Sequence, residues 1–201
     1  MKKKENSINP LWGGRFKSGI NDLAQYYSAS VDIDKRLFEV DIKGSIAYAE
    51  ALRKAKLINA NELKKIKQGL KKVLQEIKQN KFDWDQSLED VHMNIESRLA
   101  KIAGEAAKKI HTGRSRNDQI ATDLRLFLIK KIDDISDSLT VLQKTIVKLA
   151  DNNTDTIMPG LTHMQIAQPV TFGHHLMAWN EMISRDYSRI KDAQTRMDVM
   201  P

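Results

Sequence analysis

The 201-residue chain contains no cysteine, only four prolines and nine glycines, and no long apolar run. Without cysteine it can form no disulfide, bind no metal through thiolates and perform no thiol redox chemistry. A bilayer-crossing helix would need about 20 consecutive apolar residues. The basic N-terminal residues Met1–Asn6 are not followed by an apolar segment, so no signal peptide is expected. These absences predict a cytoplasmic protein with no membrane partner.

Positive charge is in excess, with 33 Lys and Arg against 26 Asp and Glu and a net charge of +7. Such an excess can indicate nucleic-acid binding. Many of the lysines, however, lie between Lys64 and Lys81 and alternate with apolar residues at helical spacing: Ile66, Leu70, Val73, Leu74 and Ile77. This pattern is typical of an amphipathic helix with a solvated basic face. Because no nucleic-acid-binding motif accompanies it, we expect no nucleic-acid partner.

The apolar periodicity predicts an all-α fold that begins with an N-terminal helical domain over residues 1–112. Helices are expected from about Asp34 to Lys56, from Asn59 onward, and from Ser87 to near Gly104. Asn59 and Glu62 have the spacing of a capping box. The first 30 residues look irregular, and no segment shows the alternation of a strand.

Two much longer helices are expected next. Apolar residues recur in steps of three and four from Ile120 to Leu149, which predicts one helix from Asn117 to about Asn152. A second should begin at Pro169, because proline suits the first helical turn. Helices of this length are typical of bundles, and two of them cannot close a core. Residues 113–201 are therefore predicted to be a truncated central helical-bundle domain, completed by other subunits and by further polypeptide.

The segment 111–119 (HTGRSRNDQ) is the first candidate site. Arg116 and Asn117 lie at the start of the predicted long helix, where free backbone N–H groups and the helix dipole favour an anion. Arginine adds a two-pronged donor that fits a carboxylate or a phosphate. The alternative is a helix cap with solvated arginines, and the spacing by itself favours neither.

The segment 159–171 (PGLTHMQIAQPVT) is the second candidate site. Histidine suits proton transfer because its ordinary pKa lies near neutrality, although a lone histidine such as His163 is more often structural. Gln165 and Gln168 could orient it, bind substrate or cap a helix. The adjacent His174 and His175 point to different sides of a helix, so we expect no metal site. His92 has the spacing of an ordinary helix-face pair with Glu96.

Five stretches of the chain together resemble the argininosuccinate lyases of the fumarase/aspartase superfamily. They are LWGGRF (11–16), SASVDIDKRLFEVD (28–41), LEDVHMNIE (88–96), HTGRSRNDQIATDLRL (111–126) and PGLTHMQIAQPVTFGHH (159–175). LWGGRF and HTGRSRNDQ are distinctive of argininosuccinate lyases, whereas PGLTHMQ-type segments occur more widely in the superfamily.

The resemblance implies reversible β-elimination of argininosuccinate to arginine and fumarate, the last step of arginine biosynthesis, without metal or organic cofactor. It implies that His163 is the catalytic histidine, acting as base or acid. It also implies a set of substrate-binding residues, of which the last is the weakest: Ser30, Asp34, Asp90, Arg116, Asn117, Thr162 and Gln168. Arginine, asparagine and threonine side chains and helix N–H groups stabilise the negative charge of the aci-carboxylate intermediate that the resemblance implies. It further implies a homotetramer in which segments of three subunits form each site.

One departure from the family pattern concerns length. Argininosuccinate lyases are more than twice as long and have a later mobile loop (a GSSxMPQKKNP-type segment) with a catalytic serine and a lysine, which these 201 residues lack. We therefore expect a fragment that is inactive by itself. Two alternatives remain. One is another fumarate-releasing lyase such as adenylosuccinate lyase, against which LWGGRF and HTGRSRNDQ argue, and the other is a non-catalytic helical assembly protein of the same fold.

Overall fold

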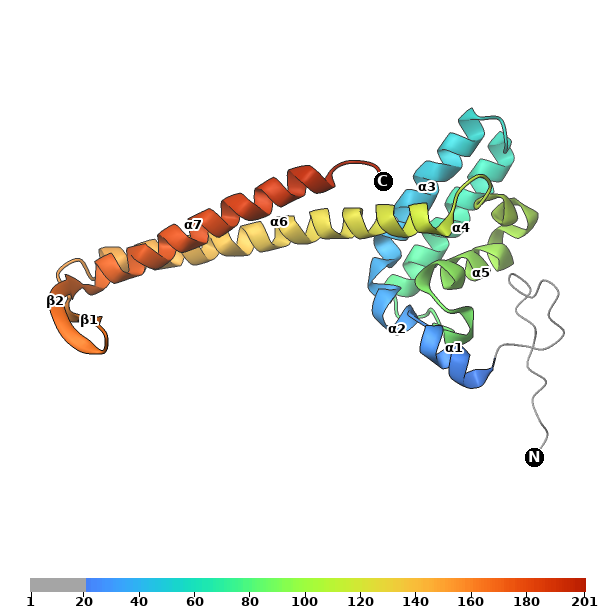
Figure 1. The fold of residues 1–201 in the computed structure, drawn as a ribbon. Coiled ribbons are helices and arrows are strands. Elements are labelled where there is room, and N and C mark those ends of the chain that lie inside the picture. Colours follow the sequence, from blue (N-terminus) through green and yellow to red (C-terminus); the bar gives the residue numbers. More distant parts are fainter. Residues whose placement is uncertain (1–20) are drawn as a thin grey trace. The chain divides into compact units, whose positions relative to one another are not determined.

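The computed structural model describes residues 21–201, so the predicted LWGGRF motif lies outside the described residues. The chain divides into two compact units, Met1–Asp123 and Leu124–Pro201. Helices dominate both units (Figure 1), and the only sheet among the described residues is a two-stranded hairpin. The predicted all-α class is confirmed. None of the helices in residues 21–201 has the length and apolar composition needed to cross a membrane.

The first unit consists of short helices and the start of a long one. Its elements are α1 (Asp22–Ser28), α2 (Val31–Asp34), the 3₁₀ turn η1 (Lys35–Leu37), α3 (Phe38–Lys54), α4 (Ala60–Lys78), η2 (Gln86–Leu88), α5 (Val91–Ala103), η3 (Gly104–Lys109) and the first residues of α6 (Arg116–Asp151). The helix predicted from Asp34 to Lys56 is therefore interrupted by η1 and continues as α3.

The core of the first unit lies among α3, α4 and α5. Side chains from all three helices are at most 3% exposed: Ile42, Ala49, Leu52, Ile66, Leu70, Val73, Ile95 and Leu99. Of the stripe predicted on α4, Leu74 is partly buried and the other four residues are buried, whereas most of the lysines of this helix are exposed. Burial of apolar surface is the dominant favourable contribution to folding, so this three-helix core is what holds the unit together.

Two helix starts in the first unit differ from their prediction. Ser87 lies in η2, and Glu89 has a φ of 66°, which a continuous right-handed helix does not permit. The helix α5 therefore starts only after Asp90, whose carboxylate accepts the Met93 N–H at 2.7 Å. The irregular structure expected before residue 30 is wrong for Asp22–Ser28, because α1 forms there. This helix buries none of its residues, so it leaves no apolar stripe in the sequence.

The second unit contains most of α6, the strands β1 (Ile157–Thr162) and β2 (Gln165–Thr171), and α7 (Phe172–Met197). The long helix predicted from Asn117 to about Asn152 matches α6 within one residue at each end. The predicted start of the next helix at Pro169 is wrong. Pro169 pairs with Pro159 in the hairpin, and α7 starts after Thr171, whose hydroxyl caps it by accepting the His174 N–H at 3.1 Å.

The prediction that no strand is present was also wrong, for a reason visible in the turn. The hairpin turns at His163 and Met164, whose φ angles are 51° and 60°. Two successive positive φ angles are the geometry of a type I′ turn, which normally selects Asn or Gly. Neither residue type is present at the turn, and most residues of both strands are exposed, so the alternation of apolar and polar residues is missing.

Much of the apolar stripe on α6 is not covered within the described chain. Its residues Leu124, Ile135, Leu142 and Leu149 are 44 to 48% exposed, and the main buried cluster of this unit consists of Ile146, Ala150 and Leu176. Soluble monomers rarely expose apolar surface along one continuous stripe. This stripe is therefore a surface suited to packing against further helices.

The capping box of α4 provides a test of the local structure. Asn59 Oδ1 accepts the Glu62 N–H at 2.9 Å, and Glu62 Oε2 accepts the Asn59 N–H at 2.8 Å. We expect Asn59→Ala to lower the free energy of unfolding by about 1 kcal/mol, because it leaves a helix N–H without a partner. Urea denaturation followed by circular dichroism measures this. Asn61→Ala, at an exposed position in the same turn, is the control, and an equal loss in both variants would contradict a capping role.

Candidate functional site

Two segments far apart in the sequence meet at the starts of α2 and α5. Ser30 Oγ donates to Asp34 Oδ2 at 2.6 Å, and Asp34 Oδ1 accepts the Val91 N–H at 3.0 Å. The Glu89 carbonyl accepts the backbone N–H of Ser30 at 2.8 Å. Burial raises the pKa of Asp34, and the hydrogen bonds from Ser30 and Val91 oppose this effect. The structure thus brings Ser30, Asp34 and the helix-capping Asp90 into one polar group.

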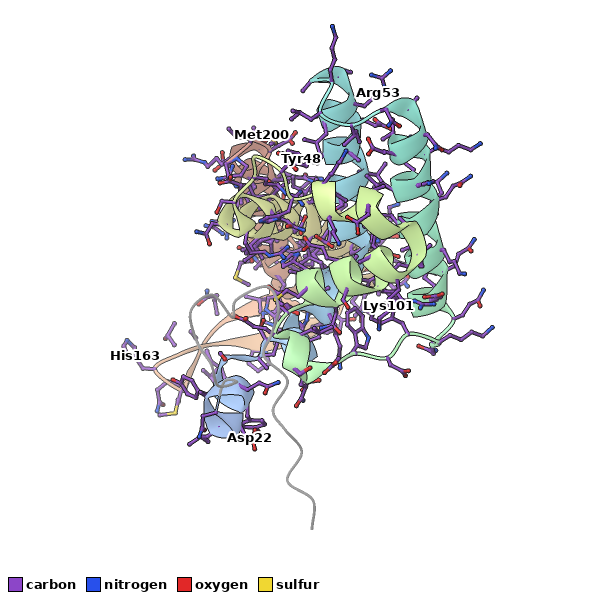
Figure 2. The ribbon with its side chains drawn as sticks, turned by 90° about the vertical axis from the view of Figure 1, so that its right-hand side faces the viewer. Asp22, Tyr48, Arg53, Lys101, His163 and Met200 are labelled. Atoms are coloured by element: carbon purple, nitrogen blue, oxygen red, sulfur yellow. The ribbon has the colours of Figure 1, made fainter. Side chains whose placement is uncertain are left out.

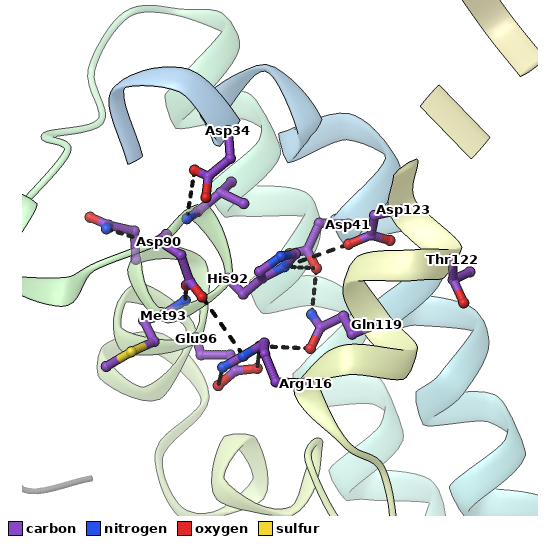
Figure 3. Close-up of polar contacts among 12 residues, drawn as sticks. Asp34, Asp41, Asp90, His92, Met93, Glu96, Arg116, Gln119, Thr122 and Asp123 are labelled. Atoms are coloured by element: carbon purple, nitrogen blue, oxygen red, sulfur yellow. Dashed lines mark hydrogen bonds and ion pairs between the residues drawn. The ribbon is translucent and has the colours of Figure 1, made fainter. Parts of the chain in front are cut away.

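Arg116, the first residue of α6, is held by acidic side chains (Figure 3). Its Nη1 and Nη2 donate to the two carboxylate oxygens of Glu96 at 2.8 and 3.0 Å, which is the two-pronged arrangement that arginine favours. Its Nε lies 4.0 Å from Asp90 Oδ2. Nη1 also donates to Gln119 Oε1 at 2.6 Å. Arg116 is therefore an oriented, charge-paired group and not a solvated arginine.

Tyr48 on α3 holds the loop that precedes α6. Its hydroxyl donates to the Thr112 carbonyl at 2.7 Å, and the Arg114 guanidinium lies over its ring, 4.5 Å from the centroid. Burial lowers the pKa of Arg114. Asn117, in contrast, is exposed, and its backbone N–H donates to Ser115 Oγ at 3.2 Å. The exposed Asn117 side chain therefore lies at the N-terminal end of α6, where the helix dipole favours an anion.

Sequence reasoning missed a buried polar cluster behind Arg116. It consists of Asp41, His92, Gln119 and Asp123, each at most 3% exposed (Figure 3). His92 Nδ1 lies 2.9 Å from Asp41 Oδ1 and 3.5 Å from Asp123 Oδ2, and Gln119 Nε2 donates to Asp41 Oδ1. The expected surface pair of His92 with Glu96 is wrong, because His92 faces the interior.

A signal for this cluster is present in the sequence. Asp41 lies on the stripe that continues through Ser45, Ala49 and Leu52, all of them buried residues of α3. His92 similarly precedes Ile95 and Leu99 at helical spacing, although polar side chains are rarely found on a core stripe. Polar residues in apolar positions would therefore have identified two members of the cluster, but not which partners they meet.

The two carboxyl groups of the cluster have opposite pKa shifts. Burial, followed by the charge on Asp41, raises the pKa of Asp123 to about 9. Although burial also acts to raise the pKa of Asp41, hydrogen bonds from His92 and Gln119 lower it. Two carboxyl groups this close cannot both ionise at low cost. At neutral pH Asp41 is therefore the carboxylate and Asp123 is the protonated partner.

The same residues have the chemical types of a metal site, since Asp41, His92 and Asp123 each offer a ligand atom within 4.8 Å of the others. The surroundings favour a proton instead. Gln119 already donates to Asp41, and the charges of Arg114 and Arg116 act on Asp123, so positive charge and N–H donors surround the cluster. A divalent cation would also require Asp123 to ionise. We therefore interpret the cluster as a site where two carboxyl groups share a proton.

The remaining predicted residues lie on the hairpin of the second unit. Thr162 pairs with Gln165, and His163 is the first turn residue, at the end of the hairpin (Figure 2). The His163 side chain is exposed, and none of the described residues makes a hydrogen bond with its imidazole. Gln168 is exposed on β2, and its carbonyl lies 2.7 Å from where a Cβ of Gly160 would be, so the strands approach closely there.

The comparison with known families gives a direct result for nearly the whole chain. Residues 14–201 match the sequence profile of a family described as lyase. The chain belongs to this lyase family. The predicted resemblance to lyases therefore extends beyond the individual motifs to residues 14–201.

Individual relatives point the same way. The chain is 54% identical to the argininosuccinate lyase of Methylococcus capsulatus over 191 residues, which are 95% of this chain and 41% of the relative. It is 51% identical to the argininosuccinate lyase of Saccharophagus degradans over all 201 residues of this chain, which correspond to 43% of that relative. The chain thus spans about two-fifths of these relatives, and the predicted resemblance is confirmed.

Solved structures of the lyase family share the fold. An EDDS lyase in complex with formate superposes with a TM-score of 0.72 at 28% identity, covering 82% of this chain and 32% of that one. A fumarate lyase/delta crystallin from Brucella melitensis has the same TM-score at 18% identity, covering 89% of this chain and 45% of that one. The second likeness concerns the fold alone.

Asp123→Asn tests the protonation of the buried cluster. Between the ordinary pKa of 3.8 and the folded value of about 9, the folded state binds a proton that the unfolded state lacks. The free energy of unfolding should therefore fall as pH rises through this window, by at most about 1.4 kcal/mol per pH unit. Asparagine cannot ionise, so the variant should show a flatter dependence in urea denaturation between about pH 5 and pH 8.

The matched control is Asp137→Asn, an exposed position on the same helix. It should keep the wild-type slope of unfolding free energy against pH. If Asp123→Asn has the wild-type slope as well, Asp123 is ionised in the folded protein and the assignment of the proton is wrong.

Proposed function

We propose that the whole protein is an argininosuccinate lyase, which reversibly cleaves argininosuccinate to arginine and fumarate without metal or organic cofactor. The observation that supports this most is the identity of about one half, over nearly the entire chain, with relatives of that name. The chain spans about two-fifths of those relatives, so the activity is proposed for the whole protein.

In this proposal the substrate is bound by residues of the first unit. They are the polar group of Ser30, Asp34 and Asp90 together with Arg116 and Asn117. Three of the five guanidinium hydrogens of Arg116 are engaged by Glu96 and Gln119, and Nε faces Asp90 Oδ2 at 4.0 Å. This leaves one hydrogen on Nη2 for a substrate carboxylate. The exposed Asn117 and the N-terminal N–H groups of α6 add neutral donors. Such donors would stabilise the charge that builds up on carboxylate oxygens during elimination.

The hairpin of the second unit provides the proton-transfer group. We assign this role to His163, with Thr162 as a substrate-binding neighbour and Gln168 as a weaker one. The left-handed backbone at His163 costs free energy in a non-glycine residue, and such strain is typically retained where function requires it. The turn presents the imidazole at the end of the exposed β1–β2 hairpin, which suits a site completed by other chains.

We also propose a homotetramer, whose long helices form a central bundle. The exposed apolar stripe of α6 supports this, because burying it would release the water that now covers it. Sites assembled from several subunits would bring together residues of different chains.

Association can be tested on the purified chain by size-exclusion chromatography with light scattering. We expect a mass of several chains, and we expect Leu142→Lys to shift the protein toward the monomer, because it places a charge on the stripe. Val141→Lys, at the 65% exposed preceding residue, which points to another side of the helix, adds the same charge outside the stripe and should leave the mass unchanged. A monomeric wild-type chain would contradict association through this surface.

The activity can be tested in a chimera in which this chain replaces the matching 41% of the Methylococcus capsulatus enzyme. The chimera should release fumarate from argininosuccinate, followed by ultraviolet absorbance, and none from adenylosuccinate. His163→Asn should lower kcat by about 10²- to 10⁴-fold, because it removes the proton-transfer group while asparagine tolerates the left-handed turn. Met164→Asn, at the other turn position, is the control and should remain active.

Two outcomes of this assay would favour the alternatives. Release of fumarate from adenylosuccinate in preference to argininosuccinate would indicate a different lyase of the superfamily. A chimera that assembles but cleaves neither substrate would favour a non-catalytic assembly protein. For the 201-residue chain by itself we propose no turnover, since its His163 imidazole has no orienting partner among the described residues; clear fumarate release would refute this.

A further inference from the structure

Gln119 joins two groups of opposite hydrogen-bonding character. On one side its Nε2 donates to Asp41 Oδ1, and on the other its Oε1 accepts from Arg116 Nη1 at 2.6 Å (Figure 3). A carboxylate can only accept and a guanidinium can only donate. The orientation of the amide is therefore determined by its two partners, and a side chain that both donates and accepts is required between them.

Each partner of Gln119 is itself fixed. Asp41 is 1% exposed and lies 2.9 Å from His92 Nδ1, which donates to it because a carboxylate cannot. Arg116 is held on its far side by the two oxygens of Glu96. Gln119 thus connects a buried anchor formed by α3 and α5 to the cation at the start of α6.

We propose that Gln119 is a positioning residue that sets the orientation of the Arg116 guanidinium by linking it to the buried Asp41–His92–Asp123 cluster. Its effect on turnover rests on the proposed function, in which Arg116 contacts a substrate carboxylate. Its effect on Arg116 itself does not, because both hydrogen bonds form within the first unit. Glu96 supplies the charge partner of Arg116, and Gln119 supplies the second point of attachment that limits rotation about the first.

Neither glutamate nor leucine, two side chains close to glutamine in size, can make both hydrogen bonds of Gln119. Gln119→Glu would place a second carboxylate against Asp41, where the only hydrogen between them was the amide N–H, and like charges in a buried site repel strongly. Gln119→Leu would fill the space but leave Asp41 and Arg116 each without one hydrogen bond. The two variants therefore separate the loss of the link from the introduction of repulsion.

The first test is a nuclear magnetic resonance measurement on the 201-residue chain. The Arg116 Nη hydrogens, assigned by their loss in Arg116→Lys, should exchange with water about tenfold faster in Gln119→Leu, the effect of losing one hydrogen bond to a charged group. Gln68→Glu, at an exposed glutamine of α4, is the control and should leave the rate unchanged. An unchanged rate in folded Gln119→Leu, or an equal change in the control, would overturn the proposal.

A second variant covers the case in which Gln119→Leu does not fold. Gln119→Glu should loosen Arg116 at neutral pH, because repulsion from the Asp41 carboxylate displaces the new side chain. Asp41→Asn in the same chain should restore slow exchange. Its amide NH2 can take the place of Oδ1, the atom that both Gln119 and His92 contact, and can donate one hydrogen to the new carboxylate and the other to His92 Nδ1 in its other tautomer. A double variant that exchanges as fast as Gln119→Glu alone would show that the contact with Asp41 does not position Arg116.

The chimera provides the functional readout. There Gln119→Leu should raise KM for argininosuccinate by about tenfold with a smaller change in kcat, because it weakens a carboxylate contact made both before and during the reaction. An unchanged KM in an active chimera would contradict the link to substrate binding. An inactive wild-type chimera would instead contradict the proposed function, and the exchange measurements on Arg116 would still decide the role of Gln119.

Discussion

The buried carboxylate of Asp41 is the interaction on which the polar interior of the first unit depends. It accepts hydrogen bonds from His92 on α5 and Gln119 on α6, so one side chain of α3 satisfies groups from two other helices. A buried polar group without a partner costs about 1 to 3 kcal/mol. Removing the Asp41 carboxylate would leave both donors in that state, whereas the apolar core among α3, α4 and α5 would remain.

From the buried Asp41 outward to Arg116, each charged group of this interior lies beside a neutral or oppositely charged partner. The buried carboxylate at Asp41 is accompanied by a neutral, protonated Asp123. Gln119 then separates it from Arg116, whose charge is matched by Glu96. Ionised groups are tolerated in a low-dielectric interior when they are paired and hydrogen-bonded. The arrangement places a charge-paired, partly buried cation at a helix start, an environment that suits the proposed recognition of a small carboxylate.

In the second unit the candidate proton-transfer residue, His163, is positioned by a hairpin turn and not by buried polar contacts. His163 lies in a tight turn with two left-handed residues, at the end of a hairpin that buries little apolar surface. The apolar stripe of α6 is equally open to solvent. Membership of the lyase family and the proposed bundle give these open surfaces one explanation, since both would be covered when further helices pack against them.

The sequence by itself determined the helical class, the long helix α6, the capping box of α4 and the family, because periodicity, caps and contiguous motifs are local properties of the chain. It also indicated which segments contain the candidate residues, although their roles as site residues stay predictions. It did not reveal the hairpin, whose turn lacks the usual Asn or Gly, or the true start of α5, which depends on the backbone at Glu89. Only the tertiary structure decided that His92 faces inward, that Asp123 takes up a proton beside Asp41, and that Gln119 connects this pair to Arg116. These properties arise from burial and from partners as many as 78 positions apart, which no local pattern encodes.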